Sequence, residues 1–249
     1  MINNFLRSLG SYYHLLFEVT KDFCTTGVNV QELTKQVVKM GRDSLPIVLL
    51  TAVFSGMVLA LQTAYGLQRF GAKDYVGNVV SLALVRELGP VLTAVMVCGR
   101  VGAGIAAEIG SMVVTEQVDA IRALGANPIQ KLVTPKIIAA ILCLPALTVI
   151  ADAVGIFGGG IVAVFELNQS SFRYERSLYY TLVIRDIVDG LLKSAVFGFL
   201  LASIACHMGL KVRGGTEGVG LTTKAAVVYG TISIFISDFF ITKLLIILS

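Results

Sequence analysis

Long apolar segments without charged side chains alternate along the chain with short charged segments. Residues 44–68 form the first of them, with 25 positions and no charge, which is long enough for a helix to cross the roughly 30 Å hydrocarbon core of a bilayer. Their apolar positions do not alternate with polar ones, as the strands of a membrane barrel require. The pattern therefore predicts an all-α membrane protein with five spans, at about 44–68, 76–111, 137–165, 191–210 and 225–248.

Several of these spans contain charged residues. Arg86 and Glu87 interrupt the second span, which we predict to be one long helix bent near Pro90. The later spans contain Asp152, Lys193 and Asp238. A charge at the bilayer centre costs roughly 2.5–3.5 kcal/mol, so each of these side chains needs a partner or a cavity. For Asp152 and Asp238, a purely structural buried pair is an equally good interpretation.

The first 43 residues have an amphipathic pattern instead. In residues 2–18 one helical face is apolar and the opposite face polar, and residues 29–42 repeat the pattern. The apolar positions of the first segment are Phe5, Leu6, Leu9, Tyr12, Tyr13, Leu16 and Phe17. We predict interfacial helices on the membrane surface, with packing on a partner protein as the alternative. The chain then divides into residues 1–43 and a five-span domain of residues 44–249.

The charged segment between spans two and three has the pattern of a short exposed helix. Val118, Ile121 and Leu124 supply an apolar side, and Gly125 and Pro128 end the helix. Its acidic and basic residues lie on the other side. Such a helix suits docking into a groove on a soluble partner, although a plain connector at the membrane surface has the same pattern.

Composition excludes several classes of protein. Hydrophobic residues make up 55% of the chain and charged residues 14%, against about 25% charged in soluble domains, and the mean hydropathy is +0.81. A soluble enzyme and a disordered scaffold are therefore excluded. The histidines and cysteines are scattered, and neither a P-loop nor a basic patch with aromatics is present. We expect no catalytic residues, no metal or cofactor on this chain, and no nucleic-acid partner.

Lysine and arginine residues outside the spans predict the orientation. Eleven lie on the side of the N-terminus and five on the opposite side. The eleven are Arg7, Lys21, Lys35, Lys39, Arg42, Arg122, Lys131, Lys136, Lys211, Arg213 and Lys224; the five are Arg69, Lys73, Arg173, Arg176 and Arg185. The positive-inside rule places the N-terminus in the cytoplasm, and five spans then place the C-terminus outside.

Small residues recur every four positions on two of the predicted spans. Gly102, Ala106 and Gly110 lie on span two, and Gly155 and Gly159 lie on span three. This spacing lets helix backbones approach closely in lipid. Packing within one chain and contact between two copies are both open, and we see no inverted repeat of the kind common in secondary transporters.

Several motifs together resemble one family of transport proteins. They read VRELGPV at 85–91, AEIGSM at 107–112, TEQ at 115–117 and GANP at 125–128, with further matching positions at 144–145, 155–160, 214–215, 218–220 and 222–223. From about residue 45 to its end, the chain is similar to the MlaE family of ABC-transporter permeases. Members of this family are the membrane subunits of phospholipid transporters, which maintain outer-membrane lipid asymmetry in Gram-negative bacteria.

The resemblance implies a set of partners in the bacterial inner membrane. It implies a homodimer of permeases, each bound to a cytoplasmic ATPase subunit that carries the ATP and magnesium. It also implies an external ring of MCE-domain proteins that bind the lipid, and a small cytoplasmic accessory subunit is a further candidate. The segment 116–128 would be the coupling helix, although Gln117 and Val118 stand where the similar loop of other importers has two alanines. Its candidate residues are Glu116, Asp119, Ala120, Arg122, Gly125 and Pro128.

The charged residues of the spans are candidates for a lipid pocket. Neighbouring residues on a helix point about 100° apart, so we expect one of Arg86 and Glu87 to pair across the bundle while the other meets the cavity. With Lys193 these residues would receive the head group, and Leu61, Leu82 and Val91 or their neighbours would contact the tails. The alternative function is an ion-coupled secondary carrier, in which Glu87, Asp152 and Asp238 relay protons.

Overall fold

The computed structural model describes residues 2–25 and 29–248, which form helices joined by short connections, with no strand in these residues. The all-α fold is therefore confirmed. The side chains of residues 2–9, among them the predicted apolar positions Phe5, Leu6 and Leu9, lie outside the part described. The elements are α1 (Ile2–Thr25), α2 (Val30–Gln68), η1 (Lys73–Tyr75), α3 (Val76–Ala83), η2 (Leu84–Leu88), α4 (Gly89–Val97), η3 (Cys98–Gly102), α5 (Ala103–Val114), α6 (Gln117–Ala123), η4 (Ile129–Val133), α7 (Thr134–Phe165), α8 (Ser171–Thr181), α9 (Ile184–Leu210) and α10 (Gly215–Leu248).

Five helical stretches in these residues are long and apolar enough to cross a membrane, as the sequence predicts. They extend beyond the predicted ends: the fourth begins at Ile184 rather than near 191, and the fifth at Gly215 rather than near 225. The absence of charge marks only the part of a helix that lies in hydrocarbon. A helix continues past the membrane surface for as long as its backbone hydrogen bonds are satisfied.

The first span continues without interruption from the segment that we expected to be a second interfacial helix. Helix α2 has 39 residues and begins after Asn29, whose side chain accepts a hydrogen bond from the Gln31 N–H at 3.0 Å. The boundary predicted at residue 43 therefore falls inside one helix. The reason is a continuous buried stripe with a residue every four positions: Met40, Ser44, Val48, Ala52, Gly56, Ala60 and Ala64.

The second span contains two π-helical turns, which divide it into α3, α4 and α5. In the first of them, η2, the Gly89 N–H donates to the Leu84 carbonyl five residues earlier. Pro90 follows in the first turn of α4, where its missing N–H disturbs the helix least. The irregularity predicted near Pro90 is thus present, as a widened turn that carries Arg86 and Glu87.

Glycines bring α2 and α7 into backbone contact. A Cβ on Gly56 would overlap the Gly155 carbonyl, and a Cβ on Gly158 would lie 2.7 Å from the Val53 carbonyl oxygen. A Cβ on Gly110 of α5 would lie 2.7 Å from the side chain of Val212. At these positions the small residues serve packing within one chain, which is one of the two interpretations the sequence left open.

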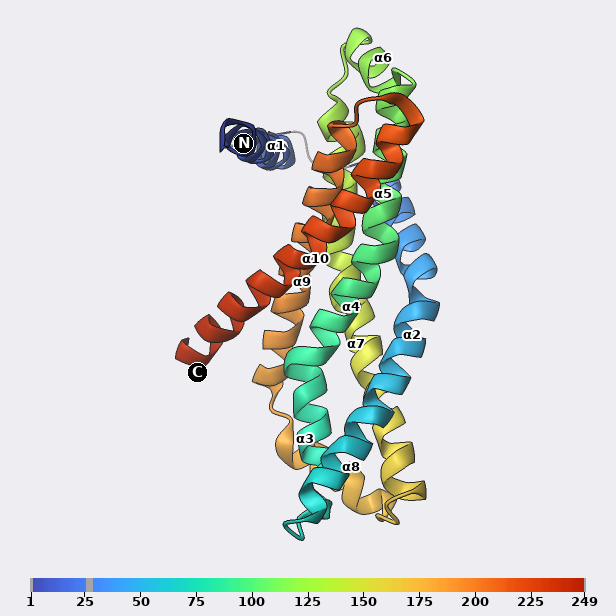
Figure 1. Cartoon of the computed structure of the whole chain (residues 1–249), viewed down its shortest axis with the longest axis vertical. Helices are drawn as coiled ribbons and strands as arrows, with labels where there is room; N and C mark the ends of the chain where they lie inside the picture. The colour runs from blue at the N-terminus through green and yellow to red at the C-terminus, as the bar shows by residue number, and fades with distance from the viewer. Residues whose placement is uncertain (1, 26–28, 249) are drawn as a thin grey trace.

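The two ends of the bundle carry different short helices (Figure 1). Helix α6 lies at one tip, here called the α6 end, and α8 lies at the opposite tip, the α8 end. Helix α1 is seen nearly end-on near the α6 end, so it lies across the direction of the spans. Helix α10 leans away from the bundle, and only 6% of its most apolar stretch is buried.

Helix α8 is fixed to the bundle by one buried tyrosine. The Tyr174 hydroxyl donates to the Ile156 carbonyl at 2.9 Å, and burial raises the pKa of Tyr174 to about 12. The phenol therefore keeps its proton, and with it the hydrogen bond, over the physiological pH range.

Candidate functional site

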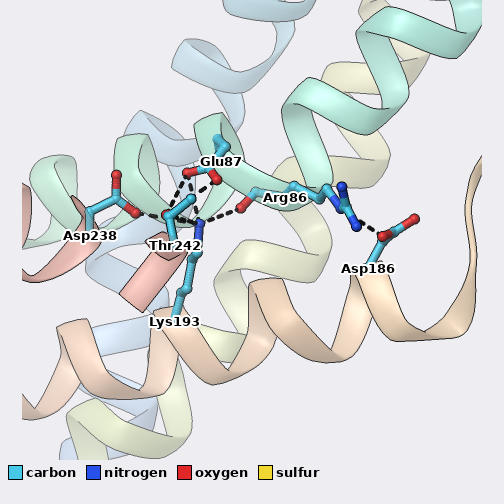
Figure 2. Close-up of polar contacts among 6 residues, drawn as sticks. All are labelled: Arg86, Glu87, Asp186, Lys193, Asp238 and Thr242. Carbon is cyan, nitrogen blue, oxygen red and sulfur yellow. Dashed lines mark hydrogen bonds and ion pairs between the residues drawn. The ribbon is translucent and has the colours of Figure 1, made fainter. Parts of the chain in front are cut away.

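The ammonium group of Lys193 is the centre of a polar cluster inside the bundle (Figure 2). Its Nζ lies 2.7 Å from Glu87 Oε2, 2.7 Å from Thr242 Oγ1 and 3.6 Å from Asp238 Oδ1. Only 2% of the Lys193 side chain is exposed, whereas Glu87 is 41% exposed. Lys193, Glu87, Asp238 and Thr242 are called the Lys193 cluster below; it joins η2, α9 and α10.

Pro90 explains one further contact of this lysine. In a regular helix the Arg86 carbonyl would accept from the N–H of residue 90, which proline lacks. Lys193 Nζ donates to that carbonyl instead, at 3.0 Å. With Glu87 and Thr242 as its other acceptors, Lys193 uses all three of its N–H donors inside the protein. No donor of Lys193 is left for a ligand in this arrangement.

Arg86 forms a second ion pair with a residue of α9, the helix that also carries Lys193. Its Nε donates to Asp186 Oδ1 at 2.7 Å, and Asp186 is 5% exposed while Arg86 is 43% exposed. The expectation that only one of Arg86 and Glu87 pairs across the bundle is therefore wrong, because both pair with residues of α9. Asp186 and Lys193 lie seven residues apart on α9, about 10 Å along its axis. Figure 2 shows Arg86 reaching toward Asp186 and Glu87 lying beside Lys193.

A cavity of about 310 Å³ adjoins both ion pairs. It is lined by Arg86, Glu87, Asp189, Lys193, Thr242, Leu245 and Ile246. The structure thus brings the three charged residues of the predicted pocket to one cavity. Arg86 and Glu87 present partly exposed charged groups there, so the cavity can bind a group that carries both charges or an anion at the guanidinium.

The apolar residues proposed for the pocket do not line this cavity. Leu61 is 40% exposed on α2, and Val91 packs against the main core. Leu82 is half-buried on α3. A separate groove of about 400 Å³ is lined by Phe54, Ser55, Val58, Leu59, Gln62, Leu88 and Leu92. Neighbours of the proposed residues, rather than those residues themselves, form an apolar surface between α2 and α4.

The two other acidic residues of the spans differ in their surroundings. Asp238 pairs with Lys193, whereas Asp152 Oδ1 is buried with no hydrogen-bond partner among the described residues. A Cβ on Gly89 would overlap that oxygen, so Asp152 lies directly against the turn that precedes Pro90. The geometry therefore agrees with a structural pair for Asp238, whereas Asp152 has no such pair among the described residues.

The segment between spans two and three forms a short helix at the α6 end. Helix α6 begins after Glu116, which has a left-handed backbone with φ of 59°, and it ends near Gly125 with φ of +77°. Asp119 and Arg122 form an exposed ion pair at 3.2 Å. The exposed residues of the segment include Leu124, of whose surface 85% is accessible. Pro128 is buried and precedes η4.

Comparison with known proteins decides the family. A family model described as Permease MlaE matches residues 33–244. The chain belongs to the MlaE permease family. A probable ABC transporter permease of Rickettsia felis is 44% identical over 240 residues, which cover 96% of this chain and 93% of that protein. One from Synechocystis is 43% identical over 220 residues, 88% of this chain and 83% of that protein.

A plant protein is also related to this MlaE-family permease. Protein trigalactosyldiacylglycerol 1, chloroplastic, of Arabidopsis thaliana is 39% identical over 209 residues, which cover 84% of this chain and 60% of that protein. The chain is accordingly a multi-pass membrane protein and a transport subunit of an ABC transporter, a class of subunit that implies an ATPase partner.

Asp186, Asp189 and Thr242 belong to the permease's charged site but were not predicted from the sequence. Asp186 and Asp189 precede the fourth span predicted at 191–210, so the absence of charge does not assign them to it. A signal was present, because Asp186 and Lys193 are seven residues apart and therefore share one helical face. Thr242 carries no comparable signal, since a threonine in an apolar helix commonly bonds its own backbone.

Replacement of Asp186 by asparagine is expected to lower the stability of the permease by about 2 kcal/mol, because a buried charge-assisted hydrogen bond to Arg86 is lost. The midpoint temperature of thermal unfolding, measured on the purified protein, should fall by roughly 4–8 °C. The control is Asp189→Asn, one turn further along α9, for which the described residues provide no ion pair. Equal melting temperatures for the two variants would contradict this role of Asp186.

Proposed function

We propose that this MlaE-family permease moves phospholipids between the bacterial inner membrane and periplasmic lipid-binding proteins of the MCE type, and so supports outer-membrane lipid asymmetry. One observation carries the proposal. A cavity with the partly exposed charges of Arg86 and Glu87 lies inside a bundle of apolar spans. A phospholipid has the matching chemistry, with a charged head group joined to apolar tails. The name of the Arabidopsis relative contains that of a galactolipid, which supports a lipid substrate.

Arg86 is the group best suited to contact a lipid phosphate. Lys193 has used its donors on Glu87, Thr242 and the Arg86 carbonyl. Arg86 has five N–H donors and gives one to Asp186, so the guanidinium keeps others for an anion. The acyl chains would lie along the apolar surfaces beside Leu61, Leu82 and Val91, of which the groove between α2 and α4 is one.

The proposed orientation follows from the charges at the two ends. Helix α6 and the start of α2 carry Arg122, Lys35 and Lys39, so we assign the α6 end to the cytoplasm. The N-terminus is then cytoplasmic and the C-terminus periplasmic. The ATPase subunit, which binds ATP and magnesium, docks on the 116–128 segment, and the MCE ring binds at the α8 end. A small cytoplasmic accessory subunit would join the complex at the α6 end.

The proposed assembly is a homodimer. Helix α10 is the span least buried within one chain, and the cavity is lined on one side by its residues Thr242, Leu245 and Ile246. A second copy beside α10 would close the cavity toward the lipid. The dimer would thus enclose a substrate that one chain leaves accessible from the membrane.

The carrier hypothesis is less well supported by the geometry. A proton relay through Glu87, Asp152 and Asp238 requires hydrogen-bonded groups in sequence. Glu87 and Asp238 meet at Lys193, but no hydrogen bond or ion pair joins Asp152 to either of them in the described residues.

Reconstitution distinguishes the two functions. The permease, its ATPase and its MCE partner are placed in vesicles with a labelled phospholipid, and the transfer of label to an acceptor is measured with ATP or with a proton gradient alone. We expect ATP-dependent transfer that requires the ATPase subunit. Transfer driven by the gradient without the ATPase would support the carrier and overturn the proposal.

Reversal of the exposed charges on α6 tests the docking site. Asp119→Lys combined with Arg122→Glu should weaken binding of the ATPase subunit while the permease stays folded, because both side chains are exposed. The control reverses a similar exposed pair at the α8 end, with Asp74→Lys and Arg173→Glu. Normal assembly and unchanged lipid-stimulated ATP hydrolysis in the α6 variant would show that this helix is not the docking element.

A further inference from the structure

A second group of charged side chains lies near the α6 end, away from the cavity of the Lys193 cluster. Glu108 of α5 accepts from Lys136 of α7 at 2.7 Å and from Lys39 of α2 at 3.0 Å, one cation on each carboxylate oxygen. Lys136 also lies 3.4 Å from Gln36 Oε1, and it is only 2% exposed. These four residues are called the Glu108 cluster below. They join three spans at one carboxylate.

The position of the Glu108 cluster along the chain relates it to the 116–128 segment. Glu108 lies six residues before the end of α5, about 9 Å along the helix axis. Helix α7 follows η4 directly, and Lys136 is its third residue. Their ion pair therefore closes the base of the loop that carries α6. A displacement of α6 reaches α5 and α7 together at this point, and Lys39 connects it to α2.

The helices joined at Glu108 lead to the charged cavity. The backbones of α2 and α7 are in contact at Gly56 and Gly155, and such close packing transmits strain from one helix to the other. Further along α7, Asp152 lies against Gly89 in the widened turn that carries Arg86 and Glu87. The contact sequence thus runs from α6 through the Glu108 cluster and α7 to the cavity wall.

We infer that Glu108 is the positioning residue that transmits displacement of the 116–128 segment to α2 and α7, and through them to the lipid cavity. This inference rests on the proposed function, in which the segment receives the motion of an ATPase. A buried carboxylate that bonds two lysines resists separation, because each group left behind would be a charge without a partner.

The first test measures lipid transferred per ATP hydrolysed in the assembled transporter. Glu108→Gln keeps the shape of the side chain and removes its charge. We expect this ratio to fall at least about fivefold, the lower end of ordinary coupling between sites, while complex yield and ATP hydrolysis stay near wild type. The control is Glu217→Gln, an exposed glutamate at the start of α10. An unchanged ratio, or a loss of transport and hydrolysis in proportion to lost complex, would overturn the inference.

A charge exchange separates transmission from simple stability. The triple variant Lys39→Glu, Glu108→Lys and Lys136→Glu reverses every charge and keeps both ion pairs. We expect it to recover most of the ratio that Glu108→Gln loses. A triple variant that assembles and hydrolyses ATP but stays uncoupled would contradict the role of the ion pairs.

A complex that hydrolyses ATP but moves no lipid would overturn the proposed function without testing the role of Glu108. A distance measurement tests that role in either case. Spin labels are placed at two exposed positions, Leu50→Cys on α2 and Ile236→Cys on α10, after replacement of the native cysteines. We expect ATP binding to change the distance between the labels in the otherwise unaltered complex and not in Glu108→Gln. A change that persists in Glu108→Gln, or no change in either, would overturn the inference.

Discussion

Replacement of Lys193 by methionine is expected to abolish lipid transfer and to destabilise the permease by about 3–5 kcal/mol, the usual effect of removing one partner from a buried ion pair. Methionine has a similar length but leaves Glu87 and the Arg86 carbonyl without their donor and Asp238 without its ion-pair partner. Unfolding of the purified protein and transfer of labelled lipid in the reconstituted complex measure the two effects. Lys243→Met, at an exposed position of α10, is the matched control.

Combined substitutions separate the structural role of the Lys193 cluster from its functional role. Adding Glu87→Gln and Asp238→Asn to Lys193→Met removes the stranded charges, so stability should largely return. Lipid transfer should remain low, because the charged wall of the cavity is gone. Transfer at wild-type rates by this neutral variant would show that the cavity does not require these charges.

Replacement of Gly56 by leucine is expected to prevent correct assembly of the bundle. Any side chain at this position would overlap the backbone of α7 at Gly155, and a backbone cannot rotate away as a flexible side chain can, so the cost should be about 3 kcal/mol or more. The fraction of monodisperse protein recovered in mild detergent measures the effect. Gly66→Leu in the same helix is the control, since nothing lies within 4 Å of a Cβ there.

The outcome for Gly66→Leu is informative in itself. Leucine favours a helix over glycine by roughly 1 kcal/mol, so this variant should be at least as stable as the wild type. Similar losses of folded protein in both variants would mean that α2 and α7 do not pack closely at Gly56.

The sequence predicts the spans well because exclusion of charge from hydrocarbon is a property of single residues. It also identifies Arg86, Glu87 and Lys193, since each is costly in a span and must lie at a polar site. The cavity places these three residues together. The sequence does not predict which apolar residues line the cavity, because this depends on the rotation of each helix about its axis. That rotation is set by packing. That rotation directs Leu61 toward the outside and Val91 into the core.

Local irregularity of the backbone is the second reason why the structure differs from the prediction made from the sequence. Pro90 predicts a disturbance, but only the three-dimensional arrangement provides Lys193 as the donor for the freed carbonyl. Ion pairs between distant segments, such as Arg86 with Asp186, likewise depend on which helices become neighbours. The 29–42 segment shows the same limit, because one amphipathic pattern suits both a helix on the membrane surface and the first turns of a longer span.

The close approach of α2 and α7 has a consequence for synthesis of the protein. Gly56 and Gly155 meet backbone to backbone, yet the ribosome adds the second roughly 5–20 s after the first at ordinary rates of translation. During that interval α2 has already entered the bilayer and its glycine surface is covered by lipid or by the insertion machinery. Completion of the fold therefore requires α7 to displace whatever occupies that surface, which makes the release of α2 from the translocon a natural point at which folding of this permease is delayed or assisted.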